Sequence, residues 1–232
     1  MRADPGPAQL GQLIWMPSFA RSTVPKITAW TTLVLFTLLV VACANRSSPG
    51  DTPRDYAGTA LDSLAADFRL VDQNGATIAL SDLRGRVVVL TFMDSRCREV
   101  CPLTAAHLRA AHQMLGDDAA SVVFIGMNVD VKANTVADVM AITSKWRLDE
   151  IPTWHFLTGS AEELEPVWKA YSIAVVPGED AIQHTPGVFL IDRAGQQRWY
   201  ISTPFDKAGT PQWTVPLSEL LVRHIRELLS IG

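Results

Sequence analysis

Two cysteines four positions apart are the most chemically informative feature of this 232-residue sequence. Cys97 and Cys101 lie in the segment FMDSRCREVCPLTAAHL, residues 92–108, between an apolar run and a helix-like run. Pro102 suits the first turn of a helix, where its missing N–H has no partner to lose. The positive end of a helix dipole favours thiolate, which is both a nucleophile and a metal ligand. The location therefore activates both sulfur atoms, whichever chemistry they perform.

The residue pattern alone leaves three roles open for this pair. A disulfide here would be a weak structural staple, because a cross-link between residues only four apart constrains the unfolded chain little. A redox couple is compatible with the segment, although the thioredoxin-type motif has two intervening residues where this sequence has three. A soft-metal site is also compatible, but two thiolates usually need a third donor.

Composition limits the kind of protein and the kind of partner. Residues of apolar type make up 48% of the chain, which is enough for a globular domain with a buried core. The formal net charge is −4, and no basic run follows the N-terminal segment. Because binding to phosphates requires a basic surface, we expect no nucleic-acid partner.

The N-terminal segment has the arrangement of an export signal. Residues 27–44, ITAWTTLVLFTLLVVACA, carry no charge and follow Arg21 and Lys26. Residues 40–43, VVAC, resemble the lipobox of bacterial lipoproteins, in which the cysteine, here Cys43, is acylated. A spanning anchor is the alternative, because about 18 uncharged residues can just cross a bilayer. Both alternatives predict a domain held at the bacterial cell membrane, on its extracytoplasmic side.

The remaining sequence divides into a linker and one domain. Residues 44–64 are rich in Ser, Pro, Gly and Asp, which predicts a flexible linker, and residues 65–232 form the domain. The apolar patterns predict a hairpin around Asn74-Gly75, buried strands at 87–93 and 121–130, a strand at 154–159 and a hairpin over 187–202. Helices are expected at 102–115, 135–146, 162–171 and 216–229. This alternation indicates an α/β three-layer sandwich, with helices on both faces of a mixed, mostly parallel sheet.

Four segments together resemble a known family. The pattern TFMDSRCREVCP, IGMNVD, FLTGSAEELEPVWKAYSI and QHTPGVFLIDRAG resembles the Sco/SenC family of thioredoxin-fold copper proteins across nearly all of residues 65–228. The resemblance implies a thioredoxin-like fold and three copper ligands, Cys97, Cys101 and His184. Two thiolates and one imidazole suit Cu(I) and can also hold Cu(II).

The same resemblance implies a role and partners. A Sco-like protein would act in cytochrome c oxidase assembly by delivering copper to the CuA site of the copper-bearing oxidase subunit. A periplasmic copper donor or a thiol reductant is the second kind of partner expected. The alternative function is that of a thiol-disulfide oxidoreductase, in which Cys97 attacks a client disulfide and Cys101 resolves the intermediate. Pro186, which looks like the cis-proline of thioredoxin-like oxidoreductases, favours that alternative.

Other polar and sulfur residues have simpler expected roles. Asp94 departs from the family, which usually has an aromatic residue there, and a carboxylate beside thiolates would raise their pKa. Asp130 lies near the site by resemblance, or acts as a helix or turn cap. Structural roles are expected for four further histidines, His107, His112, His155 and His224. Core positions are expected for three methionines, Met93, Met114 and Met127.

Overall fold

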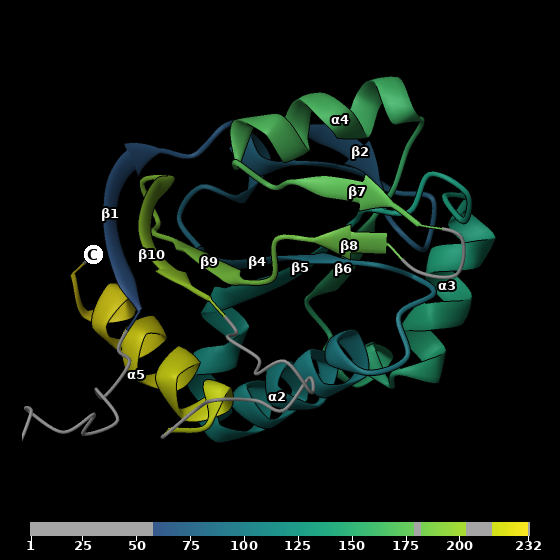
Figure 1. Ribbon diagram of the computed structural model, residues 1–232. Coiled ribbons are helices and arrows are strands. Elements are labelled where there is room, and N and C mark those ends of the chain that lie inside the picture. The colour runs from purple at the N-terminus through teal and green to yellow at the C-terminus, as the bar shows by residue number, and fades with distance from the viewer. Residues whose placement is uncertain (1–57, 179–181, 203–214, 232) are drawn as a thin grey trace, which may run out of the picture. The chain divides into compact units, whose positions relative to one another are not determined.

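The computed structural model describes residues 58–178, 182–202 and 215–231 (Figure 1). The predicted export signal or anchor at residues 1–43, with Cys43, lies outside these residues. So does most of the predicted linker. Within the described ranges, no helix combines the length and the apolar character that a membrane crossing needs.

A six-stranded mixed sheet forms the centre of the domain. Its strand order is β1-β10-β9-β4-β5-β6. The bounds are β1 (Thr59–Leu64), β10 (Gln196–Ile201), β9 (Val188–Ile191), β4 (Val87–Met93), β5 (Val122–Asn128) and β6 (Trp154–Leu157). The β4–β5 and β5–β6 pairs are parallel, and the other three pairs are antiparallel. The predicted mixed sheet is therefore confirmed, but the expectation that it is mostly parallel is wrong, because β9, β10 and β1 extend it with antiparallel strands.

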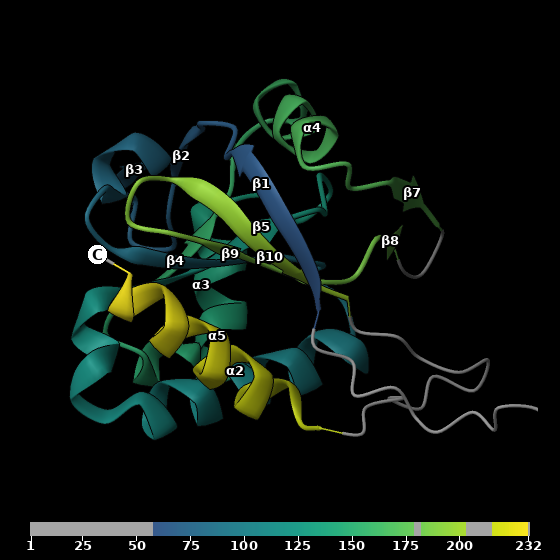
Figure 2. The same ribbon diagram turned by 90° about the vertical axis from the view of Figure 1, so that its left-hand side faces the viewer.

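Helices cover both faces of this sheet, as predicted. One face carries α2 (Val100–Leu115), α3 (Val136–Lys145) and α5 (Leu217–Ser230). The opposite face carries α4 (Ala161–Ala170) and the hairpin of β2 (Arg69–Val71) and β3 (Thr77–Ala79) (Figures 1 and 2). Three short 3-10 turns also lie in the described part of the chain, η1 (Leu80–Leu83), η2 (Gly116–Ser121) and η3 (Leu148–Glu150).

The central strand β4 holds the two halves of the core together. All seven of its residues are buried, and successive side chains point to opposite faces. Val87 and Val89 join the cluster under α2 and α5, whereas Val88 and Leu90 join the cluster under α4. The segment that follows Met93 and carries the cysteines therefore starts from a fully buried strand.

Two sequence expectations are wrong, and one hairpin was not predicted. The linker was expected to reach residue 64, but Thr59–Leu64 forms β1 and pairs with β10. Most β1 side chains are exposed, so no apolar pattern marks the strand. A second hairpin, β7 (Val175–Pro177) with β8 (Ile182–His184), was not predicted. Met114 is 45% exposed rather than a core residue, whereas Met93 and Met127 are buried as expected.

Candidate metal centre

The two cysteines lie at the junction between β4 and α2. Cys97 precedes the helix and is half-buried, whereas Cys101 lies in the first turn and is 3% exposed. A tight turn leads into the pair, because the Cys97 N–H donates to the Asp94 carbonyl at 3.1 Å and the Arg96 N–H donates to Asp94 Oδ1 at 2.8 Å. Both thiols are free in the structure.

Hydrogen bonding makes the two thiols unequal. The Cys101 side chain donates to the Cys97 sulfur, and this bond, with backbone N–H groups, lowers the pKa of Cys97 to about 6. One of those groups is the Cys101 N–H, at 3.3 Å from Cys97 Sγ. The same side-chain bond, together with burial, raises the pKa of Cys101 well above its usual range. At neutral pH Cys97 is therefore the thiolate and Cys101 keeps its proton.

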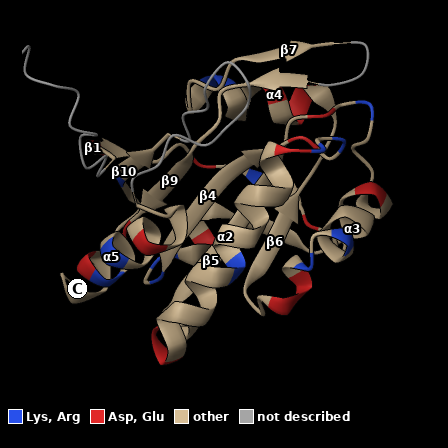
Figure 3. Cartoon of the chain, turned by 60° about the horizontal axis from the view of Figure 1, so that its bottom comes forward, with Lys and Arg blue, Asp and Glu red and all other residues tan. Residues whose placement is uncertain are grey.

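The acidity of Cys97 does not come from a cation on the neighbouring helix. Figure 3 shows both acidic and basic residues along α3 and α5. In α2, Arg109 is the single residue among Lys, Arg, Asp and Glu. Arg109 lies two turns beyond Cys101 and pairs with Glu150 at 3.3 Å. Hydrogen bonds from the start of α2 are thus the source of the lowered pKa.

This asymmetry predicts the alkylation behaviour of the reduced protein. Because the pKa of Cys97 is about 6, its reaction with iodoacetamide should rise with pH through a midpoint near 6 and be almost maximal at pH 7.5. Cys101 should stay unmodified, since it is buried and protonated. Mass spectrometry after timed alkylation measures both rates, with a protease that cleaves after Glu99 and so places the two cysteines in separate peptides. A midpoint near 8.5 for Cys97 would contradict the hydrogen-bonding scheme.

His184 ends β8 and has one ring nitrogen already committed. Its Nδ1–H donates to the Thr185 carbonyl at 3.1 Å, which leaves the Nε2 lone pair available. Burial lowers the pKa of His184, so the imidazole is neutral at neutral pH. A neutral ring with its second nitrogen held by a carbonyl is the form in which histidine binds metals.

The fold brings these predicted ligands to one place without forming a finished metal site. A small cavity of about 10 Å³ is lined by Cys101 and His184 together with Thr91, Phe92, Met93, Val100, Thr104, Pro186 and Gly187. Among the residues that the structure describes, no three His, Cys, Asp or Glu side chains gather closely enough to hold an ion. The donor types fit copper, and a three-donor site would require the imidazole and the sulfurs to draw closer together.

Two buried carboxyl groups surround the cysteine turn. Asp94 is 1% exposed, and its charge adds to the larger effects of the Cys97 bond and of burial that raise the pKa of Cys101. The prediction that it raises the pKa of both thiols is wrong for Cys97, whose pKa is lowered. Asp130 is fully buried and forms an ion pair with the Arg96 guanidinium. It also accepts the Lys132 N–H at 2.9 Å, so it lies beside the cysteine turn and caps its own turn as well. Arg96 was missed by sequence reasoning, because no motif distinguishes it from a surface arginine.

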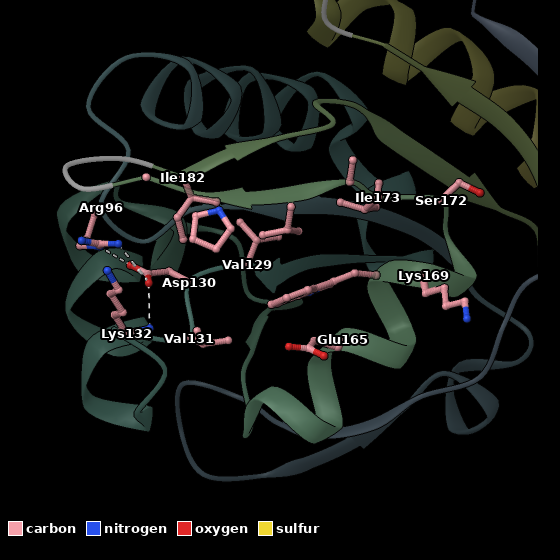
Figure 4. Close-up of a pocket in the computed structure, with 15 residues that line it drawn as sticks. Arg96, Val129, Asp130, Val131, Lys132, Glu165, Lys169, Ser172, Ile173 and Ile182 are labelled. Carbon is pink, nitrogen blue, oxygen red and sulfur yellow. Dashed lines mark hydrogen bonds and ion pairs between the residues drawn. The ribbon is translucent and has the colours of Figure 1, made fainter.

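A larger pocket adjoins the cysteine turn. It has a volume of about 620 Å³ and lies between the β7–β8 hairpin, α4 and the end of β5 (Figure 4). Arg96 and Ile182 lie at the same end of it, and the buried ring of Trp168 forms part of its apolar lining. The pocket contains neither cysteine, so it is a neighbour of the candidate centre rather than part of it.

Three of the other histidines have the structural roles expected of them. His155 Nδ1 contacts Asp72 Oδ2 at 2.9 Å. His224 is buried and stacks on the Trp199 ring with centroids 4.0 Å apart. His112 meets the Phe124 ring edge to face.

Comparison with known proteins agrees with this arrangement. A family model described as SCO1/SenC matches residues 57–210. A putative copper-binding protein of Stutzerimonas stutzeri is 26% identical over 148 residues, which cover 61% of this chain and 71% of that protein. The copper-bound structure of Bradyrhizobium japonicum ScoI superimposes with a TM-score of 0.57 at 25% identity, covering 72% of this chain and 99% of that one.

A second solved structure extends the comparison. BsSco, described as a member of the Sco family of cytochrome c oxidase assembly proteins with a disulfide switch, has a TM-score of 0.60 at 20% identity, covering 75% of this chain and 98% of that one. This likeness concerns the fold, and it confirms the predicted thioredoxin-like architecture. The family match spans well over half of the sequence. The chain therefore belongs to the SCO1/SenC family.

Proposed function

We propose that this protein is a membrane-held copper carrier that delivers copper to the CuA site of cytochrome c oxidase. Cys97, Cys101 and His184 would be its ligands. The observation that carries the proposal is the position of Cys101, which lines one cavity with His184 and whose N–H lies 3.3 Å from Cys97 Sγ. Support comes from the relatives, which include a protein described as copper-binding and a ScoI structure with copper bound.

The protonation states suit a site that takes up copper and releases it. The Cys97 thiolate would bind first, since its pKa is about 6. Copper would then displace the proton of Cys101, so binding strengthens as the pH rises. The neutral His184 ring would supply the third donor through Nε2. Acylation of Cys43, or a spanning anchor, would hold the domain on the extracytoplasmic side, where the copper-bearing oxidase subunit and a periplasmic copper donor or thiol reductant are the expected partners.

The ligand set is tested by changing the histidine. We expect His184→Ala to bind copper about 100-fold more weakly than the parent, because even outer-shell changes at metal sites weaken affinity by about 10- to 100-fold. Titration of the reduced full-length chain without oxygen, followed by absorption and EPR of the Cu(II) form, measures this. His107→Ala, on the helix that carries Cys101, is the matched control. Equal affinity of the His184→Ala protein and the parent would show that two thiolates bind copper unaided.

A thiol-disulfide oxidoreductase is the second candidate function, and the unequal thiols favour it. The Cys97 thiolate would attack a client disulfide, forming a mixed disulfide and releasing one client thiolate. Cys101, after losing its proton, would then attack the Cys97 sulfur. That step releases the second client thiol and leaves a Cys97–Cys101 disulfide, so two electrons pass to the client. A thiol reductant would restore the pair. Client reduction that survives His184→Ala but not the loss of either cysteine would favour this function.

A further inference from the structure

Asp94 links two parts of the domain that carry different ligands of the candidate centre. Its Oδ1 accepts the Arg96 N–H at 2.8 Å, inside the cysteine turn. Its Oδ2 accepts the Ile182 N–H at 3.3 Å, in strand β8. The side chain is 1% exposed. One buried carboxyl group therefore joins the turn before Cys97 to the strand that ends at His184.

The position of the β7–β8 hairpin, which carries His184, depends on its contacts with the rest of the domain. Strands β7 and β8 form a two-stranded sheet of their own, separate from the six-stranded sheet. Figure 2 shows this hairpin standing to one side of the central strands. A two-stranded hairpin is at best marginally stable by itself. Its position relative to the cysteines is therefore set by its contacts with the domain, which are the packing of Val175 and Ile182 against the core and bonds such as that from the Ile182 N–H to Asp94.

The bond from Ile182 to Asp94 lies in the same short strand as His184. Ile182 is two residues before His184, and side chains two positions apart in a strand point to the same face. Ile182 and Arg96 lie at the same end of the neighbouring pocket (Figure 4). A shift of β8 away from Asp94 would carry the imidazole away from the Cys101 cavity.

We propose that Asp94 is a positioning residue, which fastens the β7–β8 hairpin to the cysteine turn so that His184 can join the two sulfurs around copper. This rests on the proposed function, because it concerns the same three ligands. Asp94 itself would not touch the metal. It would act through His184 alone, and its removal would leave the two thiolates as binding groups.

A buried carboxyl group beside the cysteine turn could instead act on the sulfurs through its charge. Such a charge effect would not pass through His184, so it would persist when the histidine is removed. If positioning is the role of Asp94, the effect of changing it disappears without His184. The two roles therefore predict different outcomes in a double-mutant cycle.

A double-mutant cycle on the reduced full-length chain separates these roles. In Asp94→Asn the amide keeps one acceptor oxygen but turns an NH₂ group toward the other backbone N–H, so one of the two links is lost. We expect this variant to bind copper about 10- to 100-fold more weakly, as outer-shell changes do. In the His184→Ala background the same change should weaken binding no further, because a residue that acts through His184 has nothing left to position. EPR of the Cu(II) form should lose nitrogen coupling in both single variants.

Asp72→Asn is the matched control for stability. Asp72 is also 1% exposed, and its Oδ1 accepts two backbone N–H groups, from Asn74 and Ala76, each at 2.9 Å. The Asp72→Asn protein should be less stable than the parent, with no change in copper affinity or in the EPR signal. An Asp94→Asn chain that fails to fold, while Asp72→Asn folds, would assign Asp94 to the core and overturn the positioning role.

The remaining outcomes distinguish this proposal from the copper-carrier proposal. If His184→Ala weakens binding but Asp94→Asn leaves it unchanged or stronger, only the positioning role is wrong. If the two changes weaken binding independently, Asp94 acts on the thiols and the positioning role is again wrong. If His184→Ala binds copper as tightly as the parent, the three-ligand centre fails, and the positioning role fails with it.

Discussion

Cys101→Ala is expected to abolish copper binding and to raise the pKa of Cys97 at the same time. Cys101 supplies one of the two soft donors, and Cu(I) depends on thiolates for its affinity. We expect binding to weaken by more than about 100-fold, beyond the effect of an outer-shell change. The Cys101 side chain is also the main cause of the low pKa of Cys97. Without it, the alkylation midpoint of Cys97 should move from about 6 toward the ordinary thiol value.

Serine at the same position separates the two effects. Its hydroxyl can still donate a hydrogen bond to the Cys97 sulfur, but it is a poor ligand for a soft metal. Cys101→Ser should therefore lose copper binding while keeping Cys97 reactive at pH 7. Copper titration and the pH profile of alkylation, measured on both variants, give the comparison. A Cys101→Ala protein whose Cys97 still titrates near 6 would show that the helix N-terminus alone acidifies this thiol.

The central elements were predictable because their residues are buried in regular patterns. The continuous apolar run of β4 is short and rich in β-branched residues, which favours a buried strand, and its predicted bounds, 87–93, match the structure. Helix α3 was expected over 135–146 and spans Val136–Lys145, with Thr135 and Asp138 forming a capping box at its start. The end of α2 was equally clear, since Gly116 follows it with a positive φ of 58°.

The elements that escaped prediction are exposed or short. Strand β1 is held by backbone pairing with β10, which leaves no side-chain pattern to recognise. The β7–β8 hairpin has three residues in each strand, too few for a periodicity. The dipeptide Pro177-Gly178, which begins at the last residue of β7, is a turn signal that could have indicated the hairpin.

The residues of the candidate site could be named from the sequence, but their electrostatic arrangement could not. The cysteine spacing alone left three roles open, and it was the resemblance of four segments to the Sco/SenC family that named Cys97, Cys101 and His184 as candidate ligands. The bond from Cys101 to Cys97, which separates their pKa values, depends on side-chain geometry at the first turn of α2. The pairing of Arg96 with Asp130 joins residues 34 positions apart, and no local pattern encodes such a contact.

Arg96→Met is expected to lower the free energy of unfolding by about 3 kcal/mol. The change leaves the fully buried Asp130 carboxyl group without its guanidinium partner, and breaking a buried pair from one side typically costs about 3–5 kcal/mol. The lower end of that range applies, because the Arg96 side chain is 33% exposed and Asp130 keeps its bond from the Lys132 N–H. Urea unfolding of the reduced full-length chain measures the loss.

Two further variants show whether the loss of stability arises from the unpaired Asp130 carboxyl group. Arg109→Met breaks the more exposed pair with Glu150 and should lower stability by less than about 1 kcal/mol. Arg96→Met combined with Asp130→Asn should recover part of the loss, since a neutral amide is easier to bury than an unpaired charge. If Arg96→Met were no more damaging than Arg109→Met, the cysteine turn would owe its position to Asp94 and the start of α2, and the Arg96–Asp130 pair would contribute little to it.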